Sequence, residues 1–184
     1  MSTVTTAAAT TWRVDPIHSH VEFAVRHLMI STVKGRFAAV AGTLTGDERD
    51  PDSAAIELTI PAASIDTRES QRDAHLRSAD FFEADKYPDL RFRSRRVAPD
   101  RSGAFLVTGD LTIRDVTRPV TVTVHPGGRV RDLQGAERAG YSATTRISRK
   151  DFGLTWNQIL EAGGVAVGDE VTISVELQLV RTTE

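Results

Sequence analysis

The stretch DPIHSHVEFAVRHLM, residues 15–29, decides the fold class, because its apolar residues recur at every second position. Successive side chains of an extended strand point to opposite sides, so a strand here is apolar on one side and polar on the other. The apolar side carries Val21, Phe23, Val25 and, at its end, His27. The stretch therefore predicts a half-buried β-strand whose apolar side turns inward.

The same alternation returns along most of the chain. It is present in KGRFAAVAGTLTG (34–46), IELTI (56–60), LRFRSR (90–95), GDLTIR (109–114), PVTVTVH (119–125), YSATTRI (141–147) and VTISVELQL (171–179). Turn-rich connectors such as GDERDPDS (46–53) and HPGGRVRDLQG (125–135) favour antiparallel pairing. About eight such strands predict an all-β, eight-stranded antiparallel barrel, a size that can enclose one small ligand, although a two-sheet sandwich shows the same alternation.

Other segments set the boundaries of this barrel. ESQRDAHLRSA (69–79) has no Gly, no Pro and no two-residue period, so it predicts a short helical insertion with Ser70 and Asp73 spaced as a capping box. A further helical turn is predicted at 156–161. Residues 1–11 are predicted to be a disordered tail, and residues 12–182 a single barrel domain.

Composition excludes several functional classes. The 184 residues carry a formal net charge of −2 and no cysteine, which argues against a nucleic-acid partner and removes disulfides and thiolate chemistry. No run approaches the ~18 apolar residues of a membrane span, and the first residues lack the basic and apolar regions of a secretory signal. The sequence predicts a cytoplasmic protein that does not span a membrane and needs no cofactor.

Two histidines suggest a competing reading. His18 and His20 lie two residues apart, with Glu22 on the same side, which is how a strand can offer two imidazoles to a metal. That side is opposite to the apolar one, so the favoured interpretation is that His18 forms hydrogen bonds in the turn at Asp15 and Pro16. A metal-dependent small β-barrel enzyme using the His18-x-His20 pair stays an alternative, and a solid barrel acting as a stress or interaction scaffold is another.

Several stretches together carry a likeness to a known family. They are WRVDPIHSHVEFAVRHL, VKGRFAAVAGTL, ASIDTRESQRDAHLRSADFFEADKYPDLRF, GDLTIRDVTRPVTV, ISRKDFGLTWNQ and GDEVTISVELQL, and they extend from Trp12 to near Leu179. In order and spacing the chain resembles the YceI-like family, lipocalin-like β-barrel proteins associated with binding polyisoprenoid lipids. The resemblance implies a barrel that holds an amphipathic chain such as an isoprenoid quinone, and a carrier instead of an enzyme.

The predicted function is therefore binding of a long-chain amphipathic lipid inside the barrel, for transport, storage or sensing. Polar residues that end or flank the apolar rows are predicted to meet its head group, namely His27, Arg72, His75 and Arg149. The full set of predicted ligand-binding residues is Val21, Phe23, Val25, His27, Phe37, Arg72, His75, Leu76, Phe81, Phe92, Leu111, Arg149, Phe152 and Trp156. An exposed strand edge or apolar mouth leaves a homodimer open.

Overall fold

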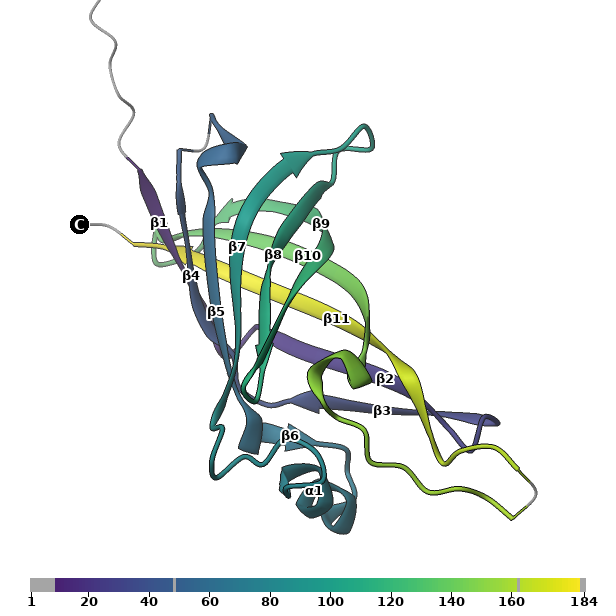
Figure 1. Ribbon diagram of the computed structural model, residues 1–184. Helices are drawn as coiled ribbons and strands as arrows, with labels where there is room; N and C mark the ends of the chain where they lie inside the picture. Colours follow the sequence, from purple (N-terminus) through teal and green to yellow (C-terminus); the bar gives the residue numbers. More distant parts are fainter. Residues whose placement is uncertain (1–8, 48, 162, 183–184) are drawn as a thin grey trace, which may run out of the picture.

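One antiparallel sheet makes up most of the protein in a computed structural model, which describes residues 9–47, 49–161 and 163–182 (Figure 1). Within these residues its strands are β1 (Thr10–Val14), β2 (His20–His27), β3 (Ser31–Phe37), β4 (Ala41–Gly46), β5 (Ala55–Pro61), β6 (Ile65–Asp66), β7 (Asp89–Pro99), β8 (Phe105–Ile113), β9 (Val116–Arg131), β10 (Glu137–Ser148) and β11 (Val167–Arg181). The short helices are α1 (Ser70–Arg77), η1 (Pro51–Ser53), η2 (Ala62–Ser64) and η3 (Arg149–Phe152).

Eight of these strands close into a ring. Their order is β1-β4-β5-β7-β8-β9-β10-β11, and β11 then pairs with β1, where Trp12 lies opposite Arg181. Closure buries the apolar side of every strand and leaves no open edge within the ring. The predicted eight-stranded antiparallel barrel with a short helical insertion is confirmed, and the sandwich is excluded.

The strand β11 joins this ring to an extension of the sheet. Its last residues lie opposite β1, with Leu179 opposite Val14, and its earlier residues lie opposite β2, with Val175 opposite Val21. β1 and β2 thus form one edge that is interrupted at residues 15–19. Beyond that interruption β2, β3 and β6 carry the sheet past the ring, and α1 lies next to β6 (Figure 1).

Hydrogen bonds to Asp15 fix the conformation of residues 15–19, which separate β1 from β2. Asp15 Oδ2 accepts hydrogen bonds from His18 Nδ1 at 2.9 Å and from Arg138 Nη1 at 2.7 Å, and Oδ1 accepts from the Ile17 N–H at 3.0 Å. The His18 bond contributes most to lowering the pKa of Asp15 to about 2; burial partly opposes it, and Ile17 and Arg138 lower the pKa further. His18 is thus a hydrogen-bonding turn residue, as the favoured interpretation expects.

These hydrogen bonds predict an acid-sensitive contribution to stability. Because the folded pKa of Asp15 lies below its ordinary value of 3.8, its stabilisation is complete above about pH 4 and is lost as the pH falls toward 2. We expect Asp15→Asn to lower the free energy of unfolding by about 1–2 kcal/mol at pH 7 and to flatten the dependence on pH below 4. Urea unfolding of both proteins at steps of pH measures this. An equally steep acid loss in the variant would contradict it.

Helical segments differ from the predictions in two places. The helix α1 has Glu69 as its N-cap, whose carboxylate accepts from the N–H groups of Gln71 and Arg72, and Ser70 with Asp73 forms no capping box. Asp73 points elsewhere, accepting from the Thr67 N–H and hydroxyl. Residues 156–161 are not helical; η3 precedes them, ends at Phe152 and has Gly153 as its C-cap, with a positive φ of 75°.

The start of the domain also needs a correction. Strand β1 begins at Thr10, so Thr10 and Thr11 belong to the sheet and not to a disordered tail. Both residues pair with β4, where Thr11 lies opposite Thr45. The rest of the predicted tail, apart from residue 9, lies outside the described residues. Among the described residues, no helix has the length and apolar character needed to cross a membrane.

Candidate functional site

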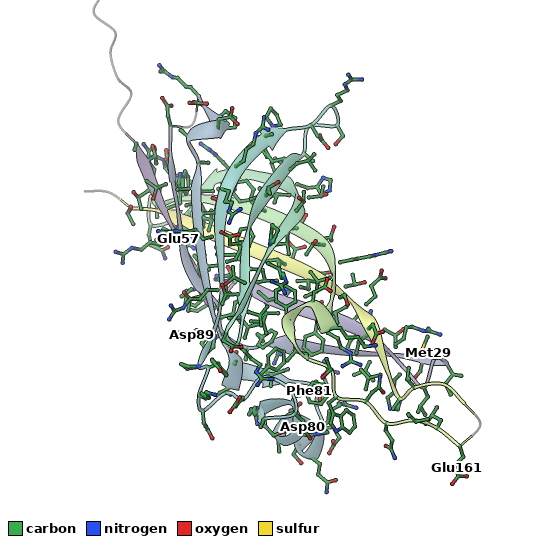
Figure 2. The ribbon with its side chains drawn as sticks, viewed as in Figure 1. Met29, Glu57, Asp80, Phe81, Asp89 and Glu161 are labelled. Atoms are coloured by element: carbon green, nitrogen blue, oxygen red, sulfur yellow. The ribbon has the colours of Figure 1, made fainter. Side chains whose placement is uncertain are left out.

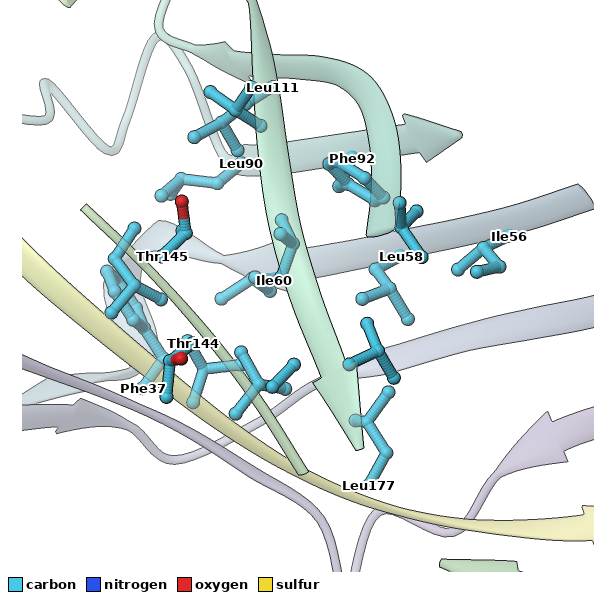
Figure 3. Close-up of a pocket in the computed structure, with 18 of the residues that line it drawn as sticks. Phe37, Ile56, Leu58, Ile60, Leu90, Phe92, Leu111, Thr144, Thr145 and Leu177 are labelled. Atoms are coloured by element: carbon cyan, nitrogen blue, oxygen red, sulfur yellow. The ribbon is translucent and has the colours of Figure 1, made fainter. Parts of the chain in front are cut away.

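A cavity of about 340 Å³ lies inside the ring and continues along β2 and β3, where Phe23, Val25 and Phe37 line it. Its volume is within the range of ~300–1,000 Å³ typical of small-molecule sites (Figure 3). Its lining is almost wholly apolar, because each strand contributes every second side chain. Strand β11 alone contributes Val171, Ile173, Val175, Leu177 and Leu179. Strands β5, β7 and β8 contribute Leu58, Leu90, Phe92 and Leu111 (Figure 3). The interior is hollow, so the reading of a solid barrel does not describe it.

Two glycines let aromatic rings lie flat in the wall. The Phe23 ring covers Gly35, and the Phe92 ring covers Gly109, so closely that a Cβ at either glycine would collide with the ring. Both rings line the cavity. Larger residues at Gly35 or Gly109 would push these rings inward and narrow the cavity.

Nine of the predicted ligand-binding residues line the cavity: Val21, Phe23, Val25, Phe37, Leu76, Phe81, Phe92, Leu111 and Arg149. The other five do not: His27, Arg72, His75, Phe152 and Trp156. His27 ends β2 opposite Val167, one step beyond the cavity-lining Val25. Phe152, the last residue of η3, is buried in the hydrophobic core. That any of these residues contacts a ligand stays a prediction.

An aromatic cluster connects α1 to the loop before β11. The His75 ring meets the edges or faces of Phe81 and Trp156 at centroid distances of 5.1 and 4.6 Å, and its Nε2 lies 2.8 Å from Asp80 Oδ2. Figure 2 shows Asp80 and Phe81 at the end of the molecule that α1 occupies. Of this cluster only Phe81 reaches the cavity, so His75 and Trp156 support its wall from behind.

Arg72 and Arg149, both predicted head-group partners, are engaged by the protein itself. Arg72 donates to the Thr67 hydroxyl and carbonyl. Arg149 is buried, and its guanidinium forms five hydrogen bonds; the acceptors are the carbonyls of Leu154, Trp156, Val167 and Gly168 and the carboxylate of Asp169. A guanidinium has five N–H donors. Arg149 thus has none left for a head group, although its side chain lines the cavity.

Burial has an electrostatic consequence for Arg149. It lowers the pKa of the guanidinium, and the carboxylate of Asp169, 3.4 Å away, opposes this shift. A buried cation without a full set of acceptors would destabilise the fold. Through the four carbonyls and the carboxylate, Arg149 acts as a clamp that joins Leu154 and Trp156 to the first residues of β11.

Some cavity residues are absent from the predicted set. Trp12 and Tyr141 line the cavity, as does Arg129, whose guanidinium carbon lies 5.1 Å from the centroid of the Trp12 ring. Arg129 falls in the stretch 125–135 predicted as a turn, but β9 continues through it after an irregularity opposite Gly140 and Tyr141. The alternation of Trp12 with Val14 is a signal that could have revealed the first of them.

The His18-x-His20 pair lies outside the cavity lining. His18 is bound to Asp15, and His20 Nε2 lies 4.0 Å from Glu22 Oε1 with both side chains about half exposed. Within the part of the chain that the structure describes, no three His, Cys, Asp or Glu side chains are grouped so that they could hold a metal ion. The geometry gives the metal-dependent alternative no site at this pair.

Comparison with known proteins agrees with this architecture. A family model described as a YceI-like domain matches residues 12–179. Protein YceI of Shigella flexneri is 37% identical over 172 residues, which cover 92% of this chain and 87% of that protein.

Two solved structures share the fold. BcnA of Burkholderia cenocepacia has a TM-score of 0.78 at 24% identity, covering 90% of this chain and 98% of that one. A polyisoprenoid binding domain from Saccharophagus degradans has a TM-score of 0.66 at 16% identity, covering 93% and 98%. Because this family model matches most of the chain, the chain belongs to the YceI-like family.

Proposed function

We propose that the protein binds a long-chain amphipathic lipid, of polyisoprenoid or isoprenoid-quinone type, inside the ring of strands. The observation that carries the proposal is the apolar cavity of about 340 Å³. Removing a hydrocarbon chain from water contributes about 0.8 kcal/mol per methylene, so a prenyl chain gains ample binding energy there before ordering costs are subtracted. The polyisoprenoid-binding description of the Saccharophagus degradans domain supports this ligand class.

The head group is proposed to lie near His27. This histidine follows the last cavity-lining residue of β2, Val25, and faces Val167, where the lining of β11 begins. Arg149 is not proposed for this role, because carbonyls and a carboxylate of the protein accept from all its donors. The proposed activity is carrying, storing or sensing the lipid, without a catalytic step.

Organic extraction of the purified protein, followed by mass spectrometry, tests the proposal. We expect one class of prenyl lipid at a constant ratio to protein. A second measurement uses geranylgeraniol added from ethanol and follows the emission of Trp12, which lines the cavity, in a Trp156→Phe background. Saturable binding at a one-to-one ratio supports the proposal; folded protein that yields no lipid and shows no uptake would refute it.

Location and assembly need their own experiments. The cytoplasmic location stays a prediction, and fractionation of cells expressing the full chain tests it. Light scattering during size-exclusion chromatography tests the homodimer. Both measurements are independent of lipid uptake.

A further inference from the structure

Three large apolar side chains are exposed together at one end of the molecule. Met29 and Ile30, in the hairpin between β2 and β3, are 52% and 79% exposed, and Ile159, in the loop before β11, is 84% exposed. We call these three residues the apolar tip. Figure 2 shows Met29 at the same end of the molecule as Glu161, which lies two residues after Ile159.

Backbone pairing brings the two parts of the apolar tip together. The hairpin lies against the start of β11, because His27 is opposite Val167 and the Leu28 N–H donates to the Ala166 carbonyl at 2.8 Å. The same segment is bridged to Ile159 through Val165. The tip is therefore one continuous feature of the sheet and not two unrelated loops.

The turn itself is poorly suited to these residues. Leu28 and Met29 have positive φ values of 50° and 59°, and the Ile30 N–H donates to the His27 carbonyl at 3.1 Å, so both central residues of this tight turn are in the left-handed region. Asn and Gly adopt this conformation with little strain, whereas bulky side chains rarely do. Strain retained at an exposed position is typical of a functional site.

Two cations lie on the hairpin strands that carry Met29 and Ile30. Arg26 Nη2 donates to the Met29 carbonyl at 2.6 Å, so its charge is held against the turn. Lys34 is exposed on β3, opposite Ala24. Apolar side chains in front of basic ones are the arrangement with which proteins enter the surface of an anionic membrane.

Two nearby carboxylates are paired with other cations, whereas a third is exposed. Asp169 accepts from Lys150 Nζ at 2.8 Å, and Glu170 lies 3.8 Å from Arg146. Glu161 adds an exposed negative charge on the neighbouring loop (Figure 2). This charge opposes docking to an anionic surface, so its removal should strengthen docking.

The apolar tip also lies at an end of the cavity. Val25 and Val167 line the cavity, and each is close to the turn, Val167 being directly opposite His27. We propose that the apolar tip docks on an anionic phospholipid bilayer and that the bound lipid exchanges with the membrane at this end. This inference rests on the proposed function for its purpose, but docking itself is measured separately.

Flotation with two kinds of vesicle tests the docking. One kind is phosphatidylcholine alone, and the other is phosphatidylcholine mixed in equal parts with phosphatidylglycerol. We expect the wild-type protein to float with the anionic vesicles and to bind the neutral ones at least about tenfold more weakly, with binding that falls as salt rises. Met29→Ser combined with Ile30→Ser is expected to weaken anionic binding by about tenfold or more.

Matched variants isolate the cause. Leu133→Ser removes a fully exposed apolar side chain from the turn between β9 and β10, near the other end of β11, and is expected to leave vesicle binding unchanged. Lys34→Gln should weaken binding to anionic vesicles alone, and Glu161→Gln should strengthen it. Wild-type protein that does not float, or an equal loss in the Leu133 variant, overturns the docking.

Uptake of geranylgeraniol from ethanol separates this inference from the proposed function. Normal uptake without flotation rejects the docking and leaves the cavity's role intact, whereas flotation without uptake rejects the lipid-binding function. A concentration-dependent dimer that the Met29 and Ile30 substitutions abolish, without any flotation of the wild type, would assign the apolar tip to a second copy of the chain and reject the docking.

Discussion

Replacing Ala143 by phenylalanine is expected to abolish most lipid uptake while the protein stays folded. Ala143 lies on β10 opposite Val175, and both residues line the cavity. A phenyl ring there takes the room of roughly four methylenes, each contributing about 0.8 kcal/mol, so geranylgeraniol should bind roughly a hundredfold more weakly. The ring fills hollow space, and we therefore expect no loss in the free energy of unfolding.

The control for this variant is Ser142→Phe. Ser142 precedes Ala143 on the same strand, so its side chain points to the other side of the sheet, and it does not line the cavity. The same ring added there should leave geranylgeraniol titrations unchanged. Undiminished binding by a folded Ala143→Phe protein would place the ligand outside the ring.

Arg149→Met is expected to have the largest effect on stability. It leaves four carbonyls and the Asp169 carboxylate without the guanidinium that binds them. Breaking such a buried network typically costs about 3–5 kcal/mol, and we expect a loss of that size in the free energy of unfolding. Urea unfolding at pH 7, followed by circular dichroism, measures it.

Two further substitutions test why Arg149 matters. Arg149→Lys keeps the charge but offers three donors from one nitrogen, so it should recover less than half of the loss. Arg146→Met changes an exposed arginine on β10 whose ion pair with Glu170 spans 3.8 Å, and we expect it to cost less than about 1 kcal/mol. A similar loss in all three variants would contradict the role of the clamp.

The period of two in the sequence predicted the strands and their buried side, but it left a two-sheet sandwich open, and only the pairing of β1 with β11 shows the closed barrel. Alternation such as that of Val171, Ile173 and Val175 places one row of side chains inside, and all three line the cavity. Such a pattern reports which side of a strand is buried, and it says little about what limits the strand. This is why β9, which continues through Gly127 and Gly128, was predicted to end too early.

Polar residues of the site were less predictable. Arg149 was predicted to meet a head group because a cation near an apolar interior suggests a polar ligand, but its acceptors come from residues up to 20 positions away in the chain. His27 continues the apolar row of β2 but does not line the cavity, although Val167 opposite it does. Both outcomes depend on tertiary contacts that no local pattern encodes.

The pairing of β1 with β11, which closes the ring, has a consequence for the order in which parts of the protein fold. Trp12 meets Arg181 across nearly the whole chain, and contacts between such distant positions form late because a long loop must close first. The closed cavity forms only after β1 pairs with β11, so a partly folded chain has no binding site for the lipid. Because the lipid binds the folded protein and not the unfolded chain, binding stabilises the folded state. The lipid-bound protein should therefore resist heat and proteolysis better than the lipid-free protein.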